Sequence, residues 1–412
     1  MITNKQAKPG DMTKFQVLCN GYDISNAVTD VHLFEDIFSP CWTANLIVMD
    51  SSNLLMSLPI TPGSEIEVQV ATQLGTSWDD DRTFKFKIAS IIEKSLINPG
   101  TYSYVLACVD RRMLSQSSQR VCKSYKDKSA SDIINNIATE YLDAEVDVHE
   151  TDSNVSLIVP NMSPLAAIPW ITKASMKNRA ADFFFFQTDT DKFSFKSFEE
   201  MFASDEESLN VTLTNSQTNV GDESGNPDID YTLNIGNYHF EHYDSVSNMA
   251  SGYFKSTVVS FDLAKKQWSK KVFNFGDDCE ADAKAKSWKD EIAEGVENAN
   301  ISFKPFSPNS FGSGLKGIQD TAGDWMGSRK SSIQKADQER LIAQIPGSVG
   351  CWKWIGKNLQ VDLPSQSEYG DEKKDKYRSG RYVVVALAHM FSKAFYAVNL
   401  EMVKKRLEEG VE

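Results

Sequence analysis

The chain has 412 residues, 41% of them hydrophobic and 11% aromatic, which is enough apolar material to fold several domains. Asp and Glu total 57 against 43 Lys and Arg, so the formal net charge is −14. An acidic chain repels phosphate, and this balance argues against a protein that grips nucleic acid.

Cysteine usage and the first residues bear on the compartment. None of the six cysteines forms a C-x-x-C pair or lies near clustered histidines, which predicts buried free thiols in a reducing compartment. The six are Cys19, Cys41, Cys108, Cys122, Cys279 and Cys351. Met1–Asp11 is polar and has no apolar signal region, and no window approaches the roughly 20 apolar residues of a membrane span. We therefore expect assembly in a cytoplasm and no membrane insertion.

Residues 1–113 are predicted to form a strand-rich first domain. Apolar and polar residues alternate with the period of two that a half-buried strand requires. The predicted strands are Phe15–Cys19, Val31–Phe34, Trp42–Met49, Glu65–Val70, Phe84–Lys87 and Tyr102–Asp110. Asp50 can cap the amides of the turn that follows it. Asp79–Asp81 invites a metal reading, but adjacent carboxylates without a calcium-loop pattern are usually solvated.

Residues 114–228 are predicted to form an α/β domain that ends in a polar linker. Ser129–Leu142 reads as a capped amphipathic helix, and a second helix begins at Ser163. Asp182–Gln187 and Lys192–Lys196 then read as a hairpin. The first of these strands carries four consecutive phenylalanines, which predicts burial on both of its faces.

Residues 229–263 together with 344–403 are predicted to form a second strand-rich domain. The segment Val349–Lys404 repeats the pattern of Ile60–Met113. The repeated strands are Leu359–Leu363, Tyr382–His389 and Phe395–Met402. Residues 264–343 read as an insertion of helices and a mobile loop, and 404–412 as a tail. The expected fold is mainly β (α+β), with two similar small antiparallel β-barrels, an α/β domain between them and a mostly helical or loop insertion in the second barrel.

Two further patterns suggest sites, and both have a simpler explanation. His239, Glu241 and His242 resemble zinc ligands, but His242 points away from the other two on a strand and no further ligand cluster is in view. Gly312-x-Gly314-x-x-Gly317 matches a dinucleotide fingerprint without the apolar strand that should precede it, which favours a flexible loop. The chain also lacks G-x-S-x-G, P-loop and H-E-x-x-H motifs. We expect no catalytic, cofactor or metal site, although a spatial pair of glycosidase carboxylates stays open.

Several long motifs resemble the central baseplate hub protein of contractile-tailed bacteriophages. In the middle of the chain a helix is followed by Pro169–Phe202, which contains the FFFF strand, and then by an acidic linker. This order of elements resembles that family. Phe38–Val70 resembles the family's opening barrel, while Gly347–Pro364 and Ser379–Arg406 resemble its second barrel.

This resemblance implies a structural, non-enzymatic protein of the virion, located in the tail baseplate and assembled in the host bacterial cytoplasm. It implies a ring-shaped homotrimer that joins the tail tube or tube-initiator proteins to the central spike, with DNA only passing through the lumen. Two alternatives stay open: the base of a type VI secretion-like spike, and a β-barrel carbohydrate-binding adhesin.

The internal repeat adds two expectations. Phe15–Met113 should superimpose, strand for strand, on Tyr231–Asp262 joined to Val349–Met402. Three chains would then present six similar units at steps of about sixty degrees, which matches a hexameric tube to a trimeric spike. The acidic composition predicts a weakly negative or neutral lumen wall.

Overall fold

The structure is a computed structural model. The structure describes residues 10–58, 60–72, 82–116, 118–152, 154–203, 208–214, 231–241, 246, 250–253, 255–263, 265–274, 300–306, 315–318, 321–336, 340–347, 350–365, 375 and 377–404.

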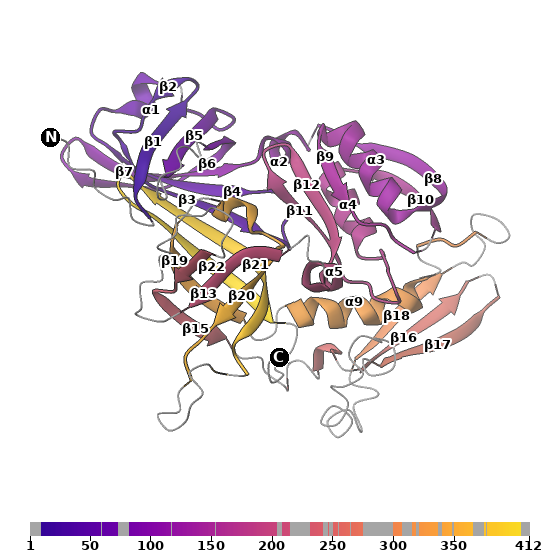
Figure 1. Ribbon diagram of the computed structural model, residues 1–412. Helices are drawn as coiled ribbons and strands as arrows, with labels where there is room; N and C mark the ends of the chain where they lie inside the picture. Colours follow the sequence, from indigo (N-terminus) through magenta and orange to yellow (C-terminus); the bar gives the residue numbers. More distant parts are fainter. Residues whose placement is uncertain are drawn as a thin grey trace.

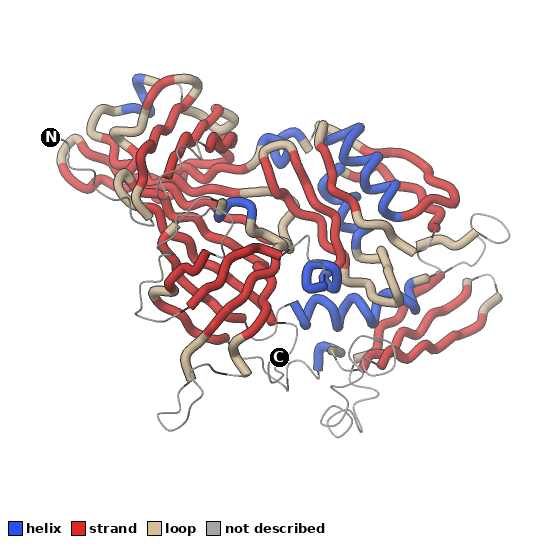
Figure 2. The backbone as a smooth tube through the Cα atoms, in the orientation of Figure 1, coloured by secondary structure: helices blue, strands red, loops and turns tan. Residues whose placement is uncertain are grey.

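One sheet of 14 strands dominates the fold (Figures 1 and 2). Seven of its strands come from the N-terminal region: β1 (Met12–Cys19), β2 (Tyr22–Asp23), β3 (Val28–Asp36), β4 (Thr43–Asp50), β5 (Glu65–Thr72), β6 (Arg82–Asn98) and β7 (Thr101–Val109). The other seven are β13 (Ser208–Thr214), β14 (Tyr231–Asn234), β15 (Asn237–Glu241), β19 (Arg340–Pro346), β20 (Asn358–Asp362), β21 (Gly380–Ser392) and β22 (Tyr396–Lys404). All strands predicted in residues 1–113 and 349–404 are therefore confirmed.

The turn after β4 forms as its sequence predicts. The buried carboxylate of Asp50 accepts hydrogen bonds from the amides of Ser52 and Leu54, and from the hydroxyl of Tyr104. Capping these amides lets the chain leave the strand through the short helix α1 (Leu54–Ser57). A second short turn, the 3₁₀ helix η3 (Cys351–Lys353), stands at the corresponding place between β19 and β20.

The α/β region packs beside the large sheet around a core of its own. Its elements are α2 (Arg111–Ser115), β8 (Val121–Ser129), α3 (Ala130–Leu142), β9 (Glu145–Val148), β10 (Asn154–Met162), α4 (Pro164–Thr172), β11 (Phe183–Asp189), β12 (Lys192–Ser197) and α5 (Phe198–Ala203). β8 and β10 form one antiparallel pair. β11, β12 and β9 form a mixed sheet, antiparallel at β11–β12 and parallel at β12–β9.

β11 joins the two cores, and this explains its four phenylalanines. Phe184 and Phe186 belong to the core of the large sheet, whereas Phe183 and Phe185 belong to the core of the α/β region. All four are at most 5% exposed, so the predicted burial on both faces is confirmed. In Figure 1, β11 and β12 lie between the large sheet and helices α3 and α4.

The residues expected to form a mostly helical or loop insertion contain strands as well, which corrects that expectation. β17 (Gln267–Asn274) and β18 (Ile301–Phe306) flank β16 (Lys255–Asp262) in a separate three-stranded sheet, against which the helix α9 (Ala322–Ala336) packs. The helix α9 ends at Ala336. β19 follows it and joins the large sheet.

The chain is mainly β with mixed sheets, as expected. The expected barrels appear as two halves of one continuous sheet. Among the described strands the order is β14-β13-β20-β21-β3-β4-β7-β6-β5-β1-β2, with β22, β19 and β15 branching from β21. In this part of the chain no ladder pairing joins β1 back to β3.

Candidate assembly interface

Five strands of the N-terminal half have the same neighbours as five strands of the C-terminal half. We call these two sets the first copy and the second copy. In the first copy the order is β3-β4-β7-β6-β5, and in the second it is β15-β19-β22-β21-β20. Every pairing within the two sets is antiparallel, and the strands follow in the same order along the chain. The repeat predicted from alternation is therefore a repeat of topology.

The two copies also share a bulge. The β6–β7 register shifts between Ile88 and Ser90, because one extra residue of β6 stands opposite β7. The β21–β22 register shifts in the same way between Val384 and Ala386. A β-bulge fixes the register of its strand, so Ile88 corresponds to Val384 and Ser90 to Ala386.

Two glycines confirm this correspondence. The amide of Gly63 donates to the carbonyl of Ile88, and the amide of Gly356 donates to the carbonyl of Val384. Both glycines have positive φ, 93° and 71°, a conformation that residues with a Cβ rarely adopt. The same backbone turn therefore leads into β5 and into β20.

The copies differ at their outer strands, which corrects part of the expected superposition. The strand beside β5 is β1 and runs antiparallel to it, whereas the strand beside β20 is β13 and runs parallel. β16, expected in the second copy, lies in the separate sheet, and its place is taken by β19. The long insertion enters between β15 and β19, where the first copy has only the short β3–β4 connection.

The two copies are joined edge to edge inside the chain. β3 pairs antiparallel with β21 from Asp30↔Ser392 to Asp36↔Ala386. β20 occupies the same edge of β21 only from Gly380 to Val383. Along this edge β21 therefore has two neighbours, β20 of the second copy and β3 of the first copy.

A buried polar group lies at this junction. Oε1 of Glu35 lies 3.3 Å from Nε2 of His389, and Nδ1 of His389 lies 2.7 Å from the hydroxyl of Tyr396. Both Glu35 and His389 are fully buried as side chains. Burial raises the pKa of Glu35, and the neighbouring His389 opposes that rise only in part. The sequence contains a signal for the burial of Glu35, because Glu35 continues the alternation of Val31 and Leu33 on the core side of the strand.

A second buried polar network joins the first copy to the α/β region. The amide of Trp42 donates to Oε1 of Gln187 (2.9 Å), and the Gln187 amide donates to Asp110 (3.0 Å). Arg112 is 2% exposed and donates to Asp110, to Asp191 and to the carbonyls of Leu142 and Thr190. Such a network is rigid when its groups are satisfied, so it sets the orientation of the α/β region against the sheet.

The residues singled out as alternative sites do not assemble into one. His239 and Glu241 lie exposed on one face of β15, while His242, Asp79–Asp81, Gly312 and Gly314 lie outside the described residues. Within the described ranges no group of three His, Cys, Asp or Glu could hold a metal ion. The described cysteines are free thiols; Cys122 is exposed, which corrects its predicted burial, and Cys279 lies outside the described residues.

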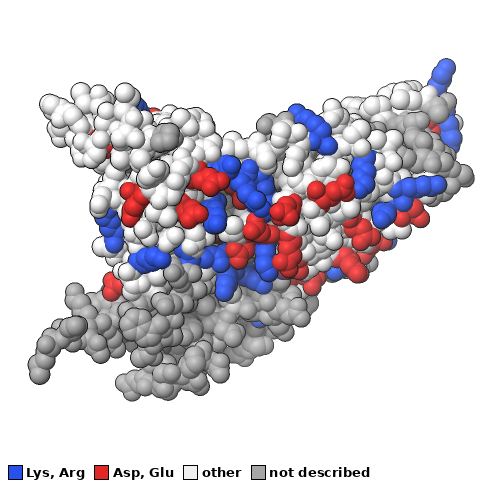
Figure 3. Space-filling view, turned by 90° about the horizontal axis from the view of Figure 1, so that it is seen from above, with Lys and Arg blue, Asp and Glu red and all other residues white. Residues whose placement is uncertain are grey.

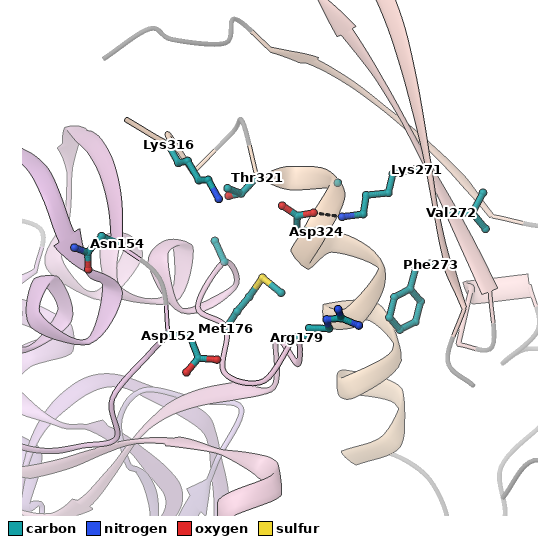
Figure 4. Close-up of a pocket in the computed structure, with 12 residues that line it drawn as sticks. Asp152, Asn154, Met176, Arg179, Lys271, Val272, Phe273, Lys316, Thr321 and Asp324 are labelled. Carbon is teal, nitrogen blue, oxygen red and sulfur yellow. Dashed lines mark hydrogen bonds and ion pairs between the residues drawn. The ribbon is translucent and has the colours of Figure 1, made fainter. Parts of the chain in front are cut away.

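One pocket of about 450 Å³ lies between the α/β region, the β16–β17–β18 sheet and α9 (Figure 4). Arg179, Lys271 and Lys316 line it together with Asp152 and Asp324. Lys271 pairs with Asp324, so one cation and one carboxylate of this lining already form an ion pair. This mixed lining does not select one ligand charge.

Surface charge is mixed as well. On the face shown in Figure 3, Lys and Arg side chains lie among Asp and Glu side chains, and neither sign forms a continuous field. None of the described helices is both long and apolar enough to cross a bilayer.

Neither a protein-family model nor a curated protein matches the sequence. Solved structures do. A tail protein from Neisseria meningitidis MC58 is similar with a TM-score of 0.56 at 11% identity, over 95% of this chain and 97% of that one. The 43 kDa tail protein of prophage MuSo2 from Shewanella oneidensis is similar with a TM-score of 0.54 at 10% identity, over 95% of this chain and 98% of that one. At these identities the similarity shows a shared fold.

Proposed function

We propose that the chain is the structural hub of a contractile phage tail baseplate. Three copies form a ring between the hexameric tail tube and the trimeric central spike, and the genome passes through the lumen. The observation that carries this proposal is the pair of register-matched copies joined by β3 and β21. The shared fold with two tail proteins supports it.

The duplication can be explained by the symmetry of the partner. A hexameric tube presents six identical surfaces, so the hub needs six similar surface patches to make the same contact with each of them. Three chains with two copies each offer six at steps of about sixty degrees. The unlike parts, which are the α/β region and the β16–β17–β18 sheet with α9, keep three-fold order for the spike.

The role requires no catalysis, cofactor or metal. In the ring the first copy belongs to a domain within residues 1–113, and the second copy belongs to a domain built from β15 and β19 to β22. The partners are two further copies, the spike and the tube or tube-initiator proteins. The net charge of −14 and the mixed surface of Figure 3 favour a lumen wall that does not hold DNA.

The test is to locate the chain in tail particles. An affinity-tagged chain should copurify with tail tube and spike proteins, and gold label should mark the baseplate end of the tail in electron micrographs. Quantitative mass spectrometry should count three copies per tail. A chain absent from tails, or one that binds glycans on an array without tail proteins, would refute the hub and favour the adhesin.

A further inference from the structure

We infer that the outer edge of β6, Ser90–Asn98, is an interface that takes β15 of a second copy of this chain, in a defined antiparallel register. This inference rests on the proposed ring and names the strands that close it. It follows from the internal repeat, because β6 corresponds to β21 and β15 corresponds to β3.

The edge in question is long, and it combines exposed apolar side chains with the charged residues Glu93 and Lys94. β5 pairs with β6 only from Arg82 to Lys87, and among the described strands nothing follows it along the same edge of β6. Three large apolar side chains there are solvent-exposed: Ile92 (41%), Leu96 (59%) and Ile97 (51%). A long exposed edge strand with apolar side chains pairs readily with another chain, and monomeric proteins usually protect it with charge or prolines.

The second copy contains the same edge in its covered state. Leu96 stands opposite Tyr102 on the neighbouring strand, as Phe391 stands opposite Tyr396. Phe391 is only 1% exposed; β3 lies alongside it, and its ring stacks on His389 and Tyr396 in the core. Leu96 of the first copy is therefore solvent-exposed at a position where the equivalent residue of the second copy, Phe391, is covered.

The occupant is identified by the same correspondence. Pairing of β3 with β4 and of β15 with β19 places His32 at the position of His239 and Val31 at that of Tyr238. Among the described strands β15 is the last of its ladder. A contact like β3–β21, made from β15 of one chain to β6 of the next, therefore continues the sheet from chain to chain.

The intramolecular junction fixes the register. His32 faces Met390 and Val31 faces Phe391 across β3 and β21. Met390 and Phe391 correspond to Ser95 and Leu96, because the β6–β7 pairs resume at Ser95↔Ser103 after a second bulge. Ser95 should therefore face the partner's His239, and Leu96 should face the partner's Tyr238, which covers the exposed leucine.

Disulfide trapping tests this register. Directly opposed residues of an antiparallel pair lie within the Cα separation of roughly 4.4–6.8 Å that a disulfide needs. In a Cys122→Ser, Cys279→Ser background, Ser95→Cys with His239→Cys should convert monomer into covalent dimer and trimer on oxidation. His32→Cys with Met390→Cys, which has the same register inside one chain, is the positive control. It should form an intramolecular disulfide without forming covalent dimer or trimer.

Three outcomes would overturn the inference. Ser95→Cys with Glu241→Cys lies two residues out of register, and equal cross-linking there would refute the register. A chain that is trimeric by native mass but never cross-links at Ser95 and His239 would refute the edge and leave the proposed ring to another surface. A chain that stays monomeric and uncross-linked at every concentration, while the positive control closes, would refute it too. The presence of the chain in tails is measured separately.

A charge on the edge provides a second test. Leu96→Lys should abolish the trimer and leave the melting temperature of the monomer unchanged, because the side chain is exposed in the monomer. Met56→Lys is the matched control, since Met56 is 82% exposed and lies on α1, outside β6 and β15. Loss of the trimer in both variants, or in neither, would contradict the inference.

Discussion

Oε1 of Glu35 lies 3.3 Å from Nε2 of His389, and neither side chain is exposed to solvent. The two residues belong to β3 and β21, the strands that join the first copy to the second. The stability of the junction between the copies therefore depends on a buried acid whose protonation changes with pH.

The first prediction concerns this pH dependence. Burial raises the pKa of Glu35 above its ordinary value, so the folded chain holds this proton more tightly than the unfolded chain does. Stability from this group is complete below the ordinary pKa of about 4.3 and is lost as pH rises through the higher folded pKa, by at most about 1.4 kcal/mol per pH unit. In urea unfolding from pH 4 upward, the wild type should therefore lose stability relative to Glu35→Gln as pH rises. Glu67→Gln, on the partly exposed face of β5, should keep the wild-type slope.

The second prediction compares the two corresponding glycines. Gly63 and Gly356 both have positive φ, so alanine at either should cost about 1–3 kcal/mol of backbone strain. A Cβ at Gly63 meets no atom, whereas a Cβ at Gly356 would lie 2.6 Å from Cζ of Phe186. Overpacking adds about 1–3 kcal/mol, so Gly356→Ala should lower the free energy of unfolding by more than Gly63→Ala. Equal losses in denaturant titrations would contradict the clash.

The third prediction concerns neighbouring arginines. Arg112 is buried and donates to Asp110 and Asp191, so Arg112→Ala leaves Asp110 buried without this partner and should cost about 3–5 kcal/mol. Arg111 also pairs with Asp191, at 3.2 Å, but its side chain is 53% exposed. Arg111→Ala should therefore cost less than about 1 kcal/mol. Thermal unfolding of the two variants makes the comparison, and similar losses would contradict a structural role for the buried network.

Much of the fold could be predicted because its strands are half-buried. Alternation marks β5, β6 and β7 and their counterparts β20, β21 and β22, since each shows one face to the core. The FFFF strand could be predicted as buried on both faces. Its place between two cores could not, because a run of one residue type does not indicate which elements pack against each face.

The misassigned elements show where local pattern is insufficient. Arg340–Pro346 is short, and three adjacent apolar residues, Leu341–Ala343, fit a helix end as well as a strand. Lys255–Asp262 has a strand pattern, but alternation does not say which sheet a strand joins. The parallel pairing of β13 with β20 links segments far apart in the chain, and no spacing rule predicts such a partner. The junction residues Glu35 and His389 likewise become a pair only through the topology.

The last prediction concerns the arrangement of the two copies in the assembled tail. If three chains close a ring through contacts like β3–β21, each copy should be related to the next by a rotation of about sixty degrees around the tail axis. Ile88 and Val384, which occupy the same bulge, should then lie at nearly the same distance from that axis. Cryo-electron microscopy of the baseplate, reconstructed with three-fold symmetry only, measures both quantities. The strands β3 to β7 should overlay their counterparts after that rotation, while the β16–β17–β18 sheet should repeat three times and not six. A ring in which one copy lies off the circle, or in which the rotation departs far from sixty degrees, would refute the symmetry adaptor even if the chain is found in the baseplate.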